Sequence, residues 1–256
     1  MPRFENKVAV VTGATSGIGR ATALALASEG AKIALASRRP GALESVQQEV
    51  RAAGGDALVV AADIKDAKAR EGIVNETIAA FGAIDLLVNS AGVIESGTVE
   101  TTTLPDWSAM FELNVTAVFH LMQLCTPALK ERRGNIVNVS SVTGIRSFPG
   151  VLAYCSSKAA LDQLTRCAAL ELAESGVRVN AVCPGVVVSG LHRTGGMDED
   201  GYASFLEHSK TTHPMGRVGQ PQEVADLILF LGSNQSGWIT GVTLPIDGGR
   251  HLTCAR

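Results

Sequence analysis

The chain has 256 residues, of which 46% are hydrophobic and 18% charged, and its formal net charge is −3. A chain of this length can bury a large core without disulfides or metals, and the slight acidity argues against a general nucleic-acid-binding protein. The N-terminal region lacks the apolar stretch of a secretory signal, and no run reaches the roughly 18 apolar residues of a membrane span.

The cysteines form no CxxC pair and no spacing typical of metal ligands. They are Cys125, Cys155, Cys167, Cys183 and Cys254. An odd number without pattern is typical of reduced thiols. We therefore expect a cytoplasmic protein without a metal site, a membrane contact or a nucleic-acid partner.

In the first half of the chain, short apolar runs alternate with helical patterns. Strands are predicted at Val8–Val11, Ile33–Ala36, Leu58–Ala62 and Ile84–Val88, and helices at Gly17–Ser28, Leu43–Ala53 and Ala67–Phe81. This alternation is typical of βαβ units, in which helices cover both faces of a parallel sheet.

The second half continues the pattern. Helices are predicted at Asp106–Leu129, Ser156–Glu174 and Glu223–Leu231, and strands at Asn135–Val139, Arg178–Val182 and Val242–Ile246. Between them, Gly185–Gly219 is predicted to be an irregular substrate loop or lid. The sequence thus predicts an α/β fold: a Rossmann-type, doubly wound, mostly parallel seven-stranded sheet in a single domain, residues 1–256.

A glycine-rich turn, TGATSGIG at Thr12–Gly19, joins the first predicted strand to the first helix. Glycines there let the main chain approach a pyrophosphate, and the helix N-terminus supplies N–H groups with a partial positive charge. The spacing is Gly-x3-Gly-x-Gly, not the commoner Gly-x-Gly-x-x-Gly. In its strand–turn–helix context, the turn favours a bound nucleotide over an ordinary βα connection.

Tyr154 and Lys158 lie four residues apart at the start of a predicted helix, so they share one helical face. A tyrosine hydroxyl has a reference pKa of about 10, and a neighbouring ammonium lowers it. Ser141 follows a strand end, where parallel sheets place their active sites. An isolated Tyr-x3-Lys pair is more often a solvated pair on a helix surface. The pair therefore indicates a catalytic site only in combination with the other motifs.

Together these motifs resemble the classical short-chain dehydrogenase/reductases, including the 3-oxoacyl and carbonyl reductases. The resemblance runs from Lys7 to about Gly249. The motifs appear in the family's order: the glycine turn, Asp63, NSAG at Asn89–Gly92, Asn114, Ser141, YCSSK at Tyr154–Lys158, and Pro184-Gly185. Ser141 precedes Tyr154 by 13 positions, as in the family's catalytic pair.

This resemblance implies hydride transfer between a nicotinamide and a carbonyl or secondary alcohol, with four catalytic residues. Tyr154 would be the general acid in reduction and the base in oxidation. Lys158 would lower the pKa of that tyrosine and hydrogen-bond the nicotinamide ribose. Ser141 would orient the substrate oxygen, and Asn114 would hold a water in a proton relay behind Lys158.

The resemblance also implies a set of cofactor-binding residues. They are Gly13, Thr15, Ser16, Gly17, Ile18, Gly19, Ser37, Arg38, Arg39, Asp63, Ile64, Asn89, Ala91, Gly92, Tyr154, Lys158, Pro184, Gly185, Val187 and Ser189. Two motifs depart from the family pattern: NSAG replaces NNAG, and Ser189 is the nearest match to the threonine that meets the nicotinamide carboxamide.

Arg38 and Arg39 follow Ser37 at the end of the second predicted strand. NAD-using members usually place an acid at the position of Ser37, where it binds the ribose 2′-OH and repels a 2′-phosphate. Here that acid is missing, and the planar fork of arginine suits phosphate oxygens. We therefore expect NADP(H) to be preferred over NAD(H). The family's second NADP marker, a basic residue before the second loop glycine, is replaced by Ser16.

Several functions compete within this reading. The first is a ketone reductase or alcohol dehydrogenase, and the alternatives are a 3-oxoacyl thioester reductase or a hydroxysteroid or sugar dehydrogenase. A non-catalytic NADP-binding regulator is an alternative from another class of function. The presence of all four expected catalytic residues argues against it. Extended-branch epimerases and divergent enoyl reductases are disfavoured by the loop spacing and the Tyr–Lys spacing.

The substrate is expected to be a small carbonyl or alcohol compound in a mostly apolar pocket. Its walls are predicted from Val93–Ser96, Val142–Leu152 and Val186–Met215, with Arg146 and Arg193 as candidate contacts for an anionic group. The family's subunit interfaces would fall on the helices near 106–129 and 156–174. A homo-oligomer is therefore expected, either a tetramer or a dimer.

Overall fold

The fold is built on a seven-stranded sheet in which every strand is parallel to its neighbours, seen in a computed structural model that describes residues 2–253. The strands are β1 (Val8–Thr12), β2 (Lys32–Ser37), β3 (Asp56–Ala61), β4 (Leu86–Asn89), β5 (Asn135–Val139), β6 (Arg178–Pro184) and β7 (Thr243–Ile246). Their order is β3-β2-β1-β4-β5-β6-β7. This confirms the expected Rossmann-type sheet, and it places the crevice of the doubly wound fold above the ends of β1 and β4.

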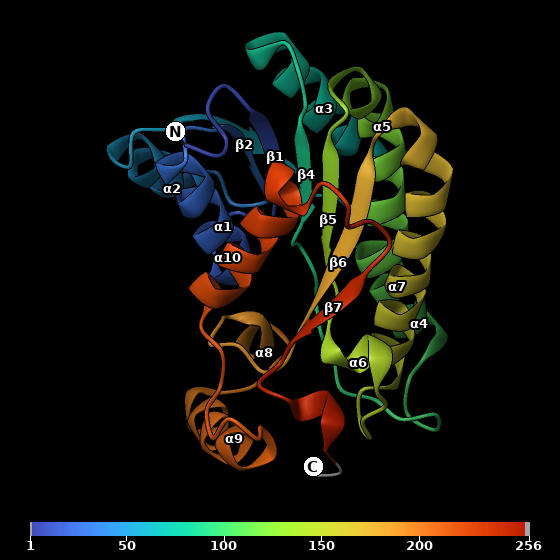
Figure 1. Cartoon of the computed structure of the whole chain (residues 1–256). Coiled ribbons are helices and arrows are strands. Elements are labelled where there is room, and N and C mark those ends of the chain that lie inside the picture. The colour runs from blue at the N-terminus through green and yellow to red at the C-terminus, as the bar shows by residue number, and fades with distance from the viewer. Residues whose placement is uncertain (1, 254–256) are drawn as a thin grey trace.

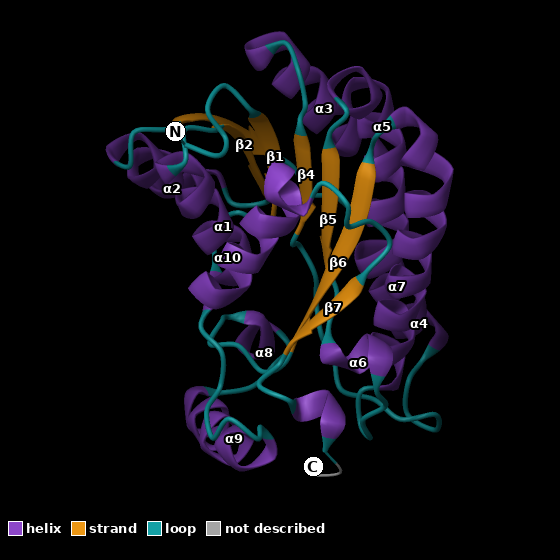
Figure 2. Ribbon diagram, in the orientation of Figure 1, coloured by secondary structure: helices purple, strands orange, loops and turns teal. Residues whose placement is uncertain are grey.

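Helices cover both faces of the sheet (Figures 1 and 2). They are α1 (Gly17–Ser28), α2 (Pro40–Ala52), α3 (Ala67–Phe81), α4 (Leu104–Phe111), α5 (Ala117–Arg132), α6 (Val142–Ile145), α7 (Leu152–Leu172), α8 (Leu191–Thr194), α9 (Glu199–Thr212) and α10 (Pro221–Gly232). One core layer holds α1, α2 and α10, with Leu26, Leu43 and Ile228 fully buried. The other holds α3, α5 and α7, with Ile73 and Leu121 fully buried.

The strands were predictable because both faces of the sheet are covered. All residues of β1, β4 and β5 are buried, so each strand reads as a nearly continuous apolar run. The four cysteines within residues 2–253 are free thiols, two of them buried, and Cys254 lies outside the described residues.

The helix predicted over Asp106–Leu129 is divided in the structure. A five-residue π-helical turn, Glu112–Thr116, separates α4 from α5 and contains the buried Asn114. Such a turn adds one residue per turn and is frequent at functional sites. Sequence periodicity could not show it, because the apolar pattern continues on both sides.

The segment Gly185–Gly219, predicted to be irregular, contains the helices α8 and α9. Helix α9 has a regular start, where Asp198 Oδ1 accepts a hydrogen bond from Gly201 N at 2.8 Å. It buries only Tyr202, Ser209 and Thr212, so it has no apolar stripe to reveal it in the sequence. The expectation of an irregular segment was therefore wrong, and its role as a substrate loop or lid stays a prediction.

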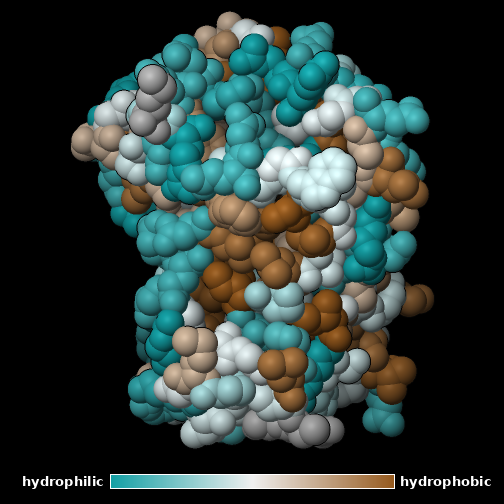
Figure 3. Space-filling view, viewed as in Figure 1, coloured by the Kyte–Doolittle hydropathy of each residue, from teal (hydrophilic) through white to brown (hydrophobic). Residues whose placement is uncertain are grey.

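Helices α8 and α9 lie beyond the ends of β6 and β7, apart from the layers over the sheet (Figures 1 and 2). Apolar side chains gather in the middle of the face that carries α10 and β7 (Figure 3). None of the helices within residues 2–253 combines the length and the apolar content needed to cross a bilayer.

Candidate functional site

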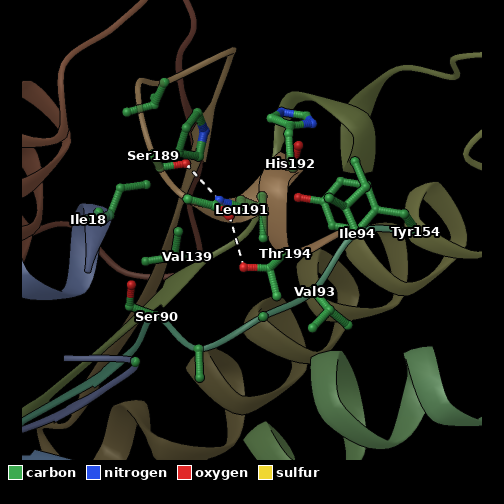
Figure 4. A pocket seen from close by; sticks show the side chains of 18 of the residues that line it. Ile18, Ser90, Val93, Ile94, Val139, Tyr154, Ser189, Leu191, His192 and Thr194 are labelled. Carbon is green, nitrogen blue, oxygen red and sulfur yellow. Dashed lines mark hydrogen bonds between the residues drawn. The ribbon is translucent and has the colours of Figure 1, made fainter. Parts of the chain in front are cut away.

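A cavity of about 690 Å³ opens at the C-terminal ends of the strands. The residues of the predicted site that line it are Gly13, Thr15, Ser16, Gly17, Ile18, Ser37, Arg38, Arg39, Asp63, Ile64, Ala91, Gly92, Ser141, Tyr154, Lys158, Pro184, Gly185, Val187 and Ser189. Three predicted residues lie behind this wall: Gly19, Asn89 and Asn114. Figure 4 shows Ile18 and Ser189 on one side of the cavity and Tyr154 on the other.

The glycine turn forms the floor of one end of the cavity. Gly13 has φ 65° and Gly17 has φ 51°, and a Cβ on Gly13 would lie 2.9 Å from Ala91 Cα. A Cβ on Gly19 would collide with the Gly13 carbonyl, so Gly19 lets α1 pack against the turn. Ser16 stands at the N-cap of α1 without a side-chain hydrogen bond to it. The first N–H groups of α1 are therefore available to an anion, which fits a pyrophosphate.

The ends of β2 and β3 form the next part of the wall. The Thr15 and Ser37 hydroxyls lie 3.1 Å apart, and Asp63 Oδ1 accepts a hydrogen bond from Lys65 N at 3.0 Å. Arg38 and Arg39 are exposed at the cavity edge, and neither pairs with a carboxylate within the described residues. This end of the cavity thus offers two unpaired guanidinium groups.

Tyr154, Lys158 and Ser141 meet in the centre of the cavity, where β5 ends and α7 begins. Tyr154 and Lys158 lie on one face of α7, with Lys158 Nζ 5.7 Å from the centre of the tyrosine ring. Lys158 Nζ donates a hydrogen bond to the Val139 carbonyl at 2.9 Å. The Ser141 hydroxyl lies close enough to Tyr154 to lower the pKa of the tyrosine. All three residues are buried, and they are brought together although 13 positions separate Ser141 from Tyr154.

Burial dominates the ionisation of this cluster. It raises the pKa of Tyr154 to about 12, against a smaller lowering by the nearby Ser141 hydroxyl. It lowers the pKa of Lys158 to about 8, which the nearby Asp162 carboxylate partly opposes. Lys158 is not among the groups that shift the pKa of Tyr154 here, so the lowering expected from its ammonium is not seen in this structure. Desolvation, which penalises the charged tyrosinate, is the largest cause of the shift.

Asn114 lies in the π-helical turn behind the cavity wall. Its side chain holds the main chain of Val93 from both sides: Oδ1 accepts from Val93 N at 3.1 Å, and Nδ2 donates to Val93 O at 3.0 Å. The same Nδ2 lies 3.1 Å from Ser157 Oγ. A Cβ on Gly92 would lie 3.3 Å from Asn114 Oδ1 and 3.7 Å from Lys158 Nζ. Asn114 thus fixes the segment beside Lys158.

Asn89 is a link inside the sheet and does not line the cavity. Its Nδ2 donates to Asn138 Oδ1 at 2.9 Å, and Asn138 Nδ2 donates to Thr165 Oγ1 at 2.9 Å. The chain of bonds connects β4, β5 and α7. Above it, Thr12 Oγ1 accepts hydrogen bonds from Ser90 N and Ala91 N, both at 3.1 Å. The departure from NNAG at Ser90 leaves these contacts intact, because Ser90 takes part only through its main-chain N–H.

The segment after β6 is anchored by α9. Ser189 N donates to the Tyr202 hydroxyl at 3.0 Å, and Ser189 Oγ accepts from Leu191 N at 3.4 Å (Figure 4). His213 is buried, with its Nε2 accepting from Val186 N at 3.1 Å and its Nδ1 2.6 Å from Ser209 O. These contacts require a neutral His213 with the proton on Nδ1, and burial lowers its pKa accordingly.

The lining of the cavity extends the predicted set of wall residues. Lining residues from helices that the sequence did not predict fall within the expected wall segment Val186–Met215: His192 from α8, and Phe205, His208 and Ser209 from α9. Arg250 also lines the cavity, from the turn after β7. Arg250 reaches the cavity because the chain turns back toward it after Ile246, at the end of β7. No local sequence motif predicts this turn.

Comparisons with known proteins agree with this geometry. The chain matches a protein-family profile described as Enoyl-(Acyl carrier protein) reductase over residues 13–251. It is 38% identical over 248 residues to the 2,5-dichloro-2,5-cyclohexadiene-1,4-diol dehydrogenase LinX of Sphingobium indicum, covering 96% of this chain and 97% of the relative. It is also 38% identical over 248 residues to the 3-oxoacyl-(acyl-carrier-protein) reductase FabG of Thermotoga maritima, covering 96% and 98%.

A solved structure shares the whole fold. A short-chain dehydrogenase/reductase from Caenorhabditis elegans, crystallised with its cofactor, superposes with a TM-score of 0.93 at 36% sequence identity, covering 98% of this chain and 97% of that chain. The chain therefore belongs to the short-chain dehydrogenase/reductase family, in its classical, 3-oxoacyl reductase-like group of nicotinamide-dependent oxidoreductases.

Proposed function

We propose that the protein is an NADP(H)-dependent oxidoreductase that interconverts a carbonyl group and a secondary alcohol, with Tyr154 as the general acid and base. The observation that carries this proposal is the convergence of Tyr154, Ser141 and Lys158 at one point of the cavity wall. There the three side chains line the same wall, and Ser141 lies close enough to lower the pKa of the tyrosine. A bound nicotinamide dinucleotide supplies or accepts the hydride.

In reduction, Ser141 holds the substrate oxygen and Tyr154 gives it a proton. A neutral tyrosine is suited to this task, because burial keeps its hydroxyl protonated across the physiological pH range. Lys158 supplies positive charge beside the tyrosinate left behind. Asn114 is proposed to take part in a proton relay behind Lys158. The side chains of Asn114 and Lys158 both lie close to Gly92, which supports this role.

The residues present fit a dinucleotide with a 2′-phosphate. The glycine turn leaves space and free N–H groups for the pyrophosphate, and Asp63 and Ile64 lie where an adenine would bind. Gly92, Pro184, Gly185, Val187 and Ser189 would surround the nicotinamide. Arg38, assisted by Arg39, is proposed to bind the 2′-phosphate. Neither forms an ion pair within residues 2–253, and a serine, Ser37, stands where NAD-using members usually have an acid.

For the substrate we propose a small carbonyl or alcohol compound with apolar parts. The far end of the cavity is mostly apolar, with Val142, Phe148, Val151 and Leu191 in its wall. The relatives described above act, by their names, on a cyclic diol or on 3-oxoacyl thioesters. Both are compounds of this class, so each is a candidate for the first assay.

The proposed assembly is a homo-oligomer, with a tetramer favoured, in the cytoplasm. Leu170 on α7 is 80% exposed and Phe119 on α5 is 48% exposed, although both are large apolar side chains. A second copy that covers these helices would bury them. The buried free thiols Cys125 and Cys183 suit a reducing compartment.

A panel assay tests the proposed function. Oxidation of NADPH is followed with an acetoacetyl thioester, aromatic ketones, diketones, steroids and sugars. At least one carbonyl compound should be reduced, and Tyr154→Phe should lower kcat by several orders of magnitude while NADPH still binds. Turnover that survives in Tyr154→Phe, or no reduction across the panel, would reject the proposal and favour a cofactor-binding regulator.

A further inference from the structure

The substrate end of the cavity carries one strong positive charge. Within residues 2–253, the charged residues that line the cavity are Arg38, Arg39, Asp63, Lys65, Lys158 and Arg250. The first four follow β2 and β3, at one edge of the sheet, and Lys158 belongs to the catalytic centre. Arg250 follows β7 at the opposite edge, beside the apolar wall.

The Arg250 guanidinium is held in place by neutral groups. Its Nη1 donates to Thr212 Oγ1 at the end of α9, and its Cζ lies 4.9 Å from the centre of the Phe148 ring, which also lines the cavity. Within the described residues, no carboxylate lies within ion-pair distance of it. Asp247 has both oxygens engaged, by Gly249 and His251. A half-buried cation of this kind gains from any anion that reaches it.

Arg146 supports Arg250 from behind. Its Nη1 donates to the Arg250 carbonyl at 2.7 Å, and its Cζ lies 5.3 Å from the same Phe148 ring. Arg146 does not line the cavity, so it adds positive charge and holds the turn without touching a ligand there. The other candidate from the sequence, Arg193, is already paired with Glu199 at 2.7 Å and lies over the Tyr202 ring.

We propose that Arg250 binds an anionic oxygen group, a carboxylate or a phosphate, at the end of the substrate remote from the reacting carbonyl. The inference rests on the proposed function, because it assigns the far end of the same substrate. It narrows the substrate class to carbonyl or alcohol compounds whose apolar middle carries an anionic end. Arg250 is then a specificity-determining residue, and Arg146 and Thr212 are its positioning residues.

The test compares matched substrates with and without the anion. Levulinate and its longer oxo-acid homologues are each compared with their methyl esters, and the phosphate ester of 5-hydroxypentan-2-one is compared with the free alcohol. The ratio of kcat/KM for the anion to that for its neutral partner should reach about tenfold for the chain length that spans the site. The oxo acids test a carboxylate as the anionic group, and the phosphate ester tests a phosphate.

Variants assign the effect to one side chain. In Arg250→Gln the ratio should fall to about one, mainly through KM, whereas Arg250→Lys should keep part of it. Lys210→Gln is the matched control, because it removes a positive charge from α9 at a residue outside the cavity. A general loss of folding would depress the acid and the ester alike, which leaves their ratio unchanged.

The outcomes separate the two proposals. If esters and ketones are reduced but the acids show no advantage, or if Arg250→Gln keeps the advantage, the anion site is wrong while the proposed function stands. If no compound is reduced, the proposed function fails. Calorimetric titration with the oxo acids then still decides the anion site, since Arg250→Gln should weaken their binding about tenfold. Equal binding to both proteins would overturn it.

Discussion

Tyr154 and Lys158 are buried together, and burial moves their pKa values in opposite directions. The pKa of the tyrosine rises to about 12 and that of the lysine falls to about 8. Lys158 is therefore the member of the pair whose charge changes closest to neutral pH. Its ammonium, and not the tyrosine hydroxyl, sets the electrostatic state of the site between neutrality and mild alkali.

The lowered pKa of Lys158 predicts a pH-dependent stability. Between pH 8 and 10.5, the pKa values of the folded and unfolded lysine, the unfolded chain binds more protons. The contribution of Lys158 to the free energy of unfolding should therefore rise with pH across this window, by about 3 kcal/mol in total. Below pH 8 its full burial penalty applies. Urea unfolding of the wild type and Lys158→Met at several pH values measures the difference.

The direction of the stability difference between the two proteins follows from the lowered pKa of Lys158. Relative to the wild type, Lys158→Met should be most stable below pH 8 and should lose this advantage as the pH rises. Tyr154 acts in the opposite sense only between pH 10 and 12, because its pKa is raised in the folded chain. Adding Tyr154→Phe to both proteins removes that second contribution. A stability difference that does not vary with pH would contradict the burial of a titrating lysine.

Arg38 is predicted to set the cofactor preference. Arg38→Ala should lower the ratio of kcat/KM for NADPH to that for NADH by about tenfold or more, because a charged hydrogen bond to the 2′-phosphate is lost. Arg39→Ala should have a smaller effect. Arg51→Ala, in the last turn of α2, serves as a control that removes an exposed charge outside the cavity. A preference that does not move in Arg38→Ala would contradict the assignment.

At the scale of elements, the sheet and its covering helices were predictable and the substrate segment was not. Strands such as β1 and β5 are buried on both faces, so their apolar runs stand out in the sequence. Helix α9 packs through Tyr202, Ser209 and Thr212, and its position depends on contacts with distant main-chain groups. Local patterns carry no information about such contacts.

The anchoring of the segment after β6 by α9 leads to a prediction for Tyr202→Phe. Removing the hydroxyl leaves Ser189 N without its acceptor, which should cost about 1–3 kcal/mol locally. The substrate KM should rise several-fold with a smaller change in kcat. In hydrogen exchange, peptides covering residues 186–191 should exchange faster, and those of β5 should not change. Unchanged protection at 186–191 would show that α9 does not hold this segment.

At the scale of the whole molecule, some parts of the site could be predicted from the sequence and others could not. The glycine turn and NSAG, which contribute residues to the cavity lining, could be recognised from short sequence motifs. Arg250 was missed because β7 must first pair with β6 before the following turn can reach the cavity. The π-helical turn at Asn114 was missed because one extra residue in a helix leaves no trace in composition.

The exposed apolar residues of α5 and α7 predict a subunit interface. Leu170→Glu combined with Phe119→Glu should place two charges in that interface and convert the oligomer into a smaller species, measured by light scattering with size-exclusion chromatography. Val99→Glu is the control, since Val99 is 81% exposed but lies outside both helices. If the double variant keeps the mass of the wild type, the interface lies elsewhere.

The central claim is that this cavity carries out hydride transfer to a carbonyl carbon, with Tyr154 giving the proton. The most direct test is reduction of a ketone by NADPH deuterated at either transferable position of the nicotinamide ring, with mass spectrometry of the alcohol. The account predicts deuterium on the alcohol carbon from one of the two labelled forms only, and no such product with Tyr154→Phe. Product without deuterium from either form, or labelled product at an undiminished rate in Tyr154→Phe, would contradict it.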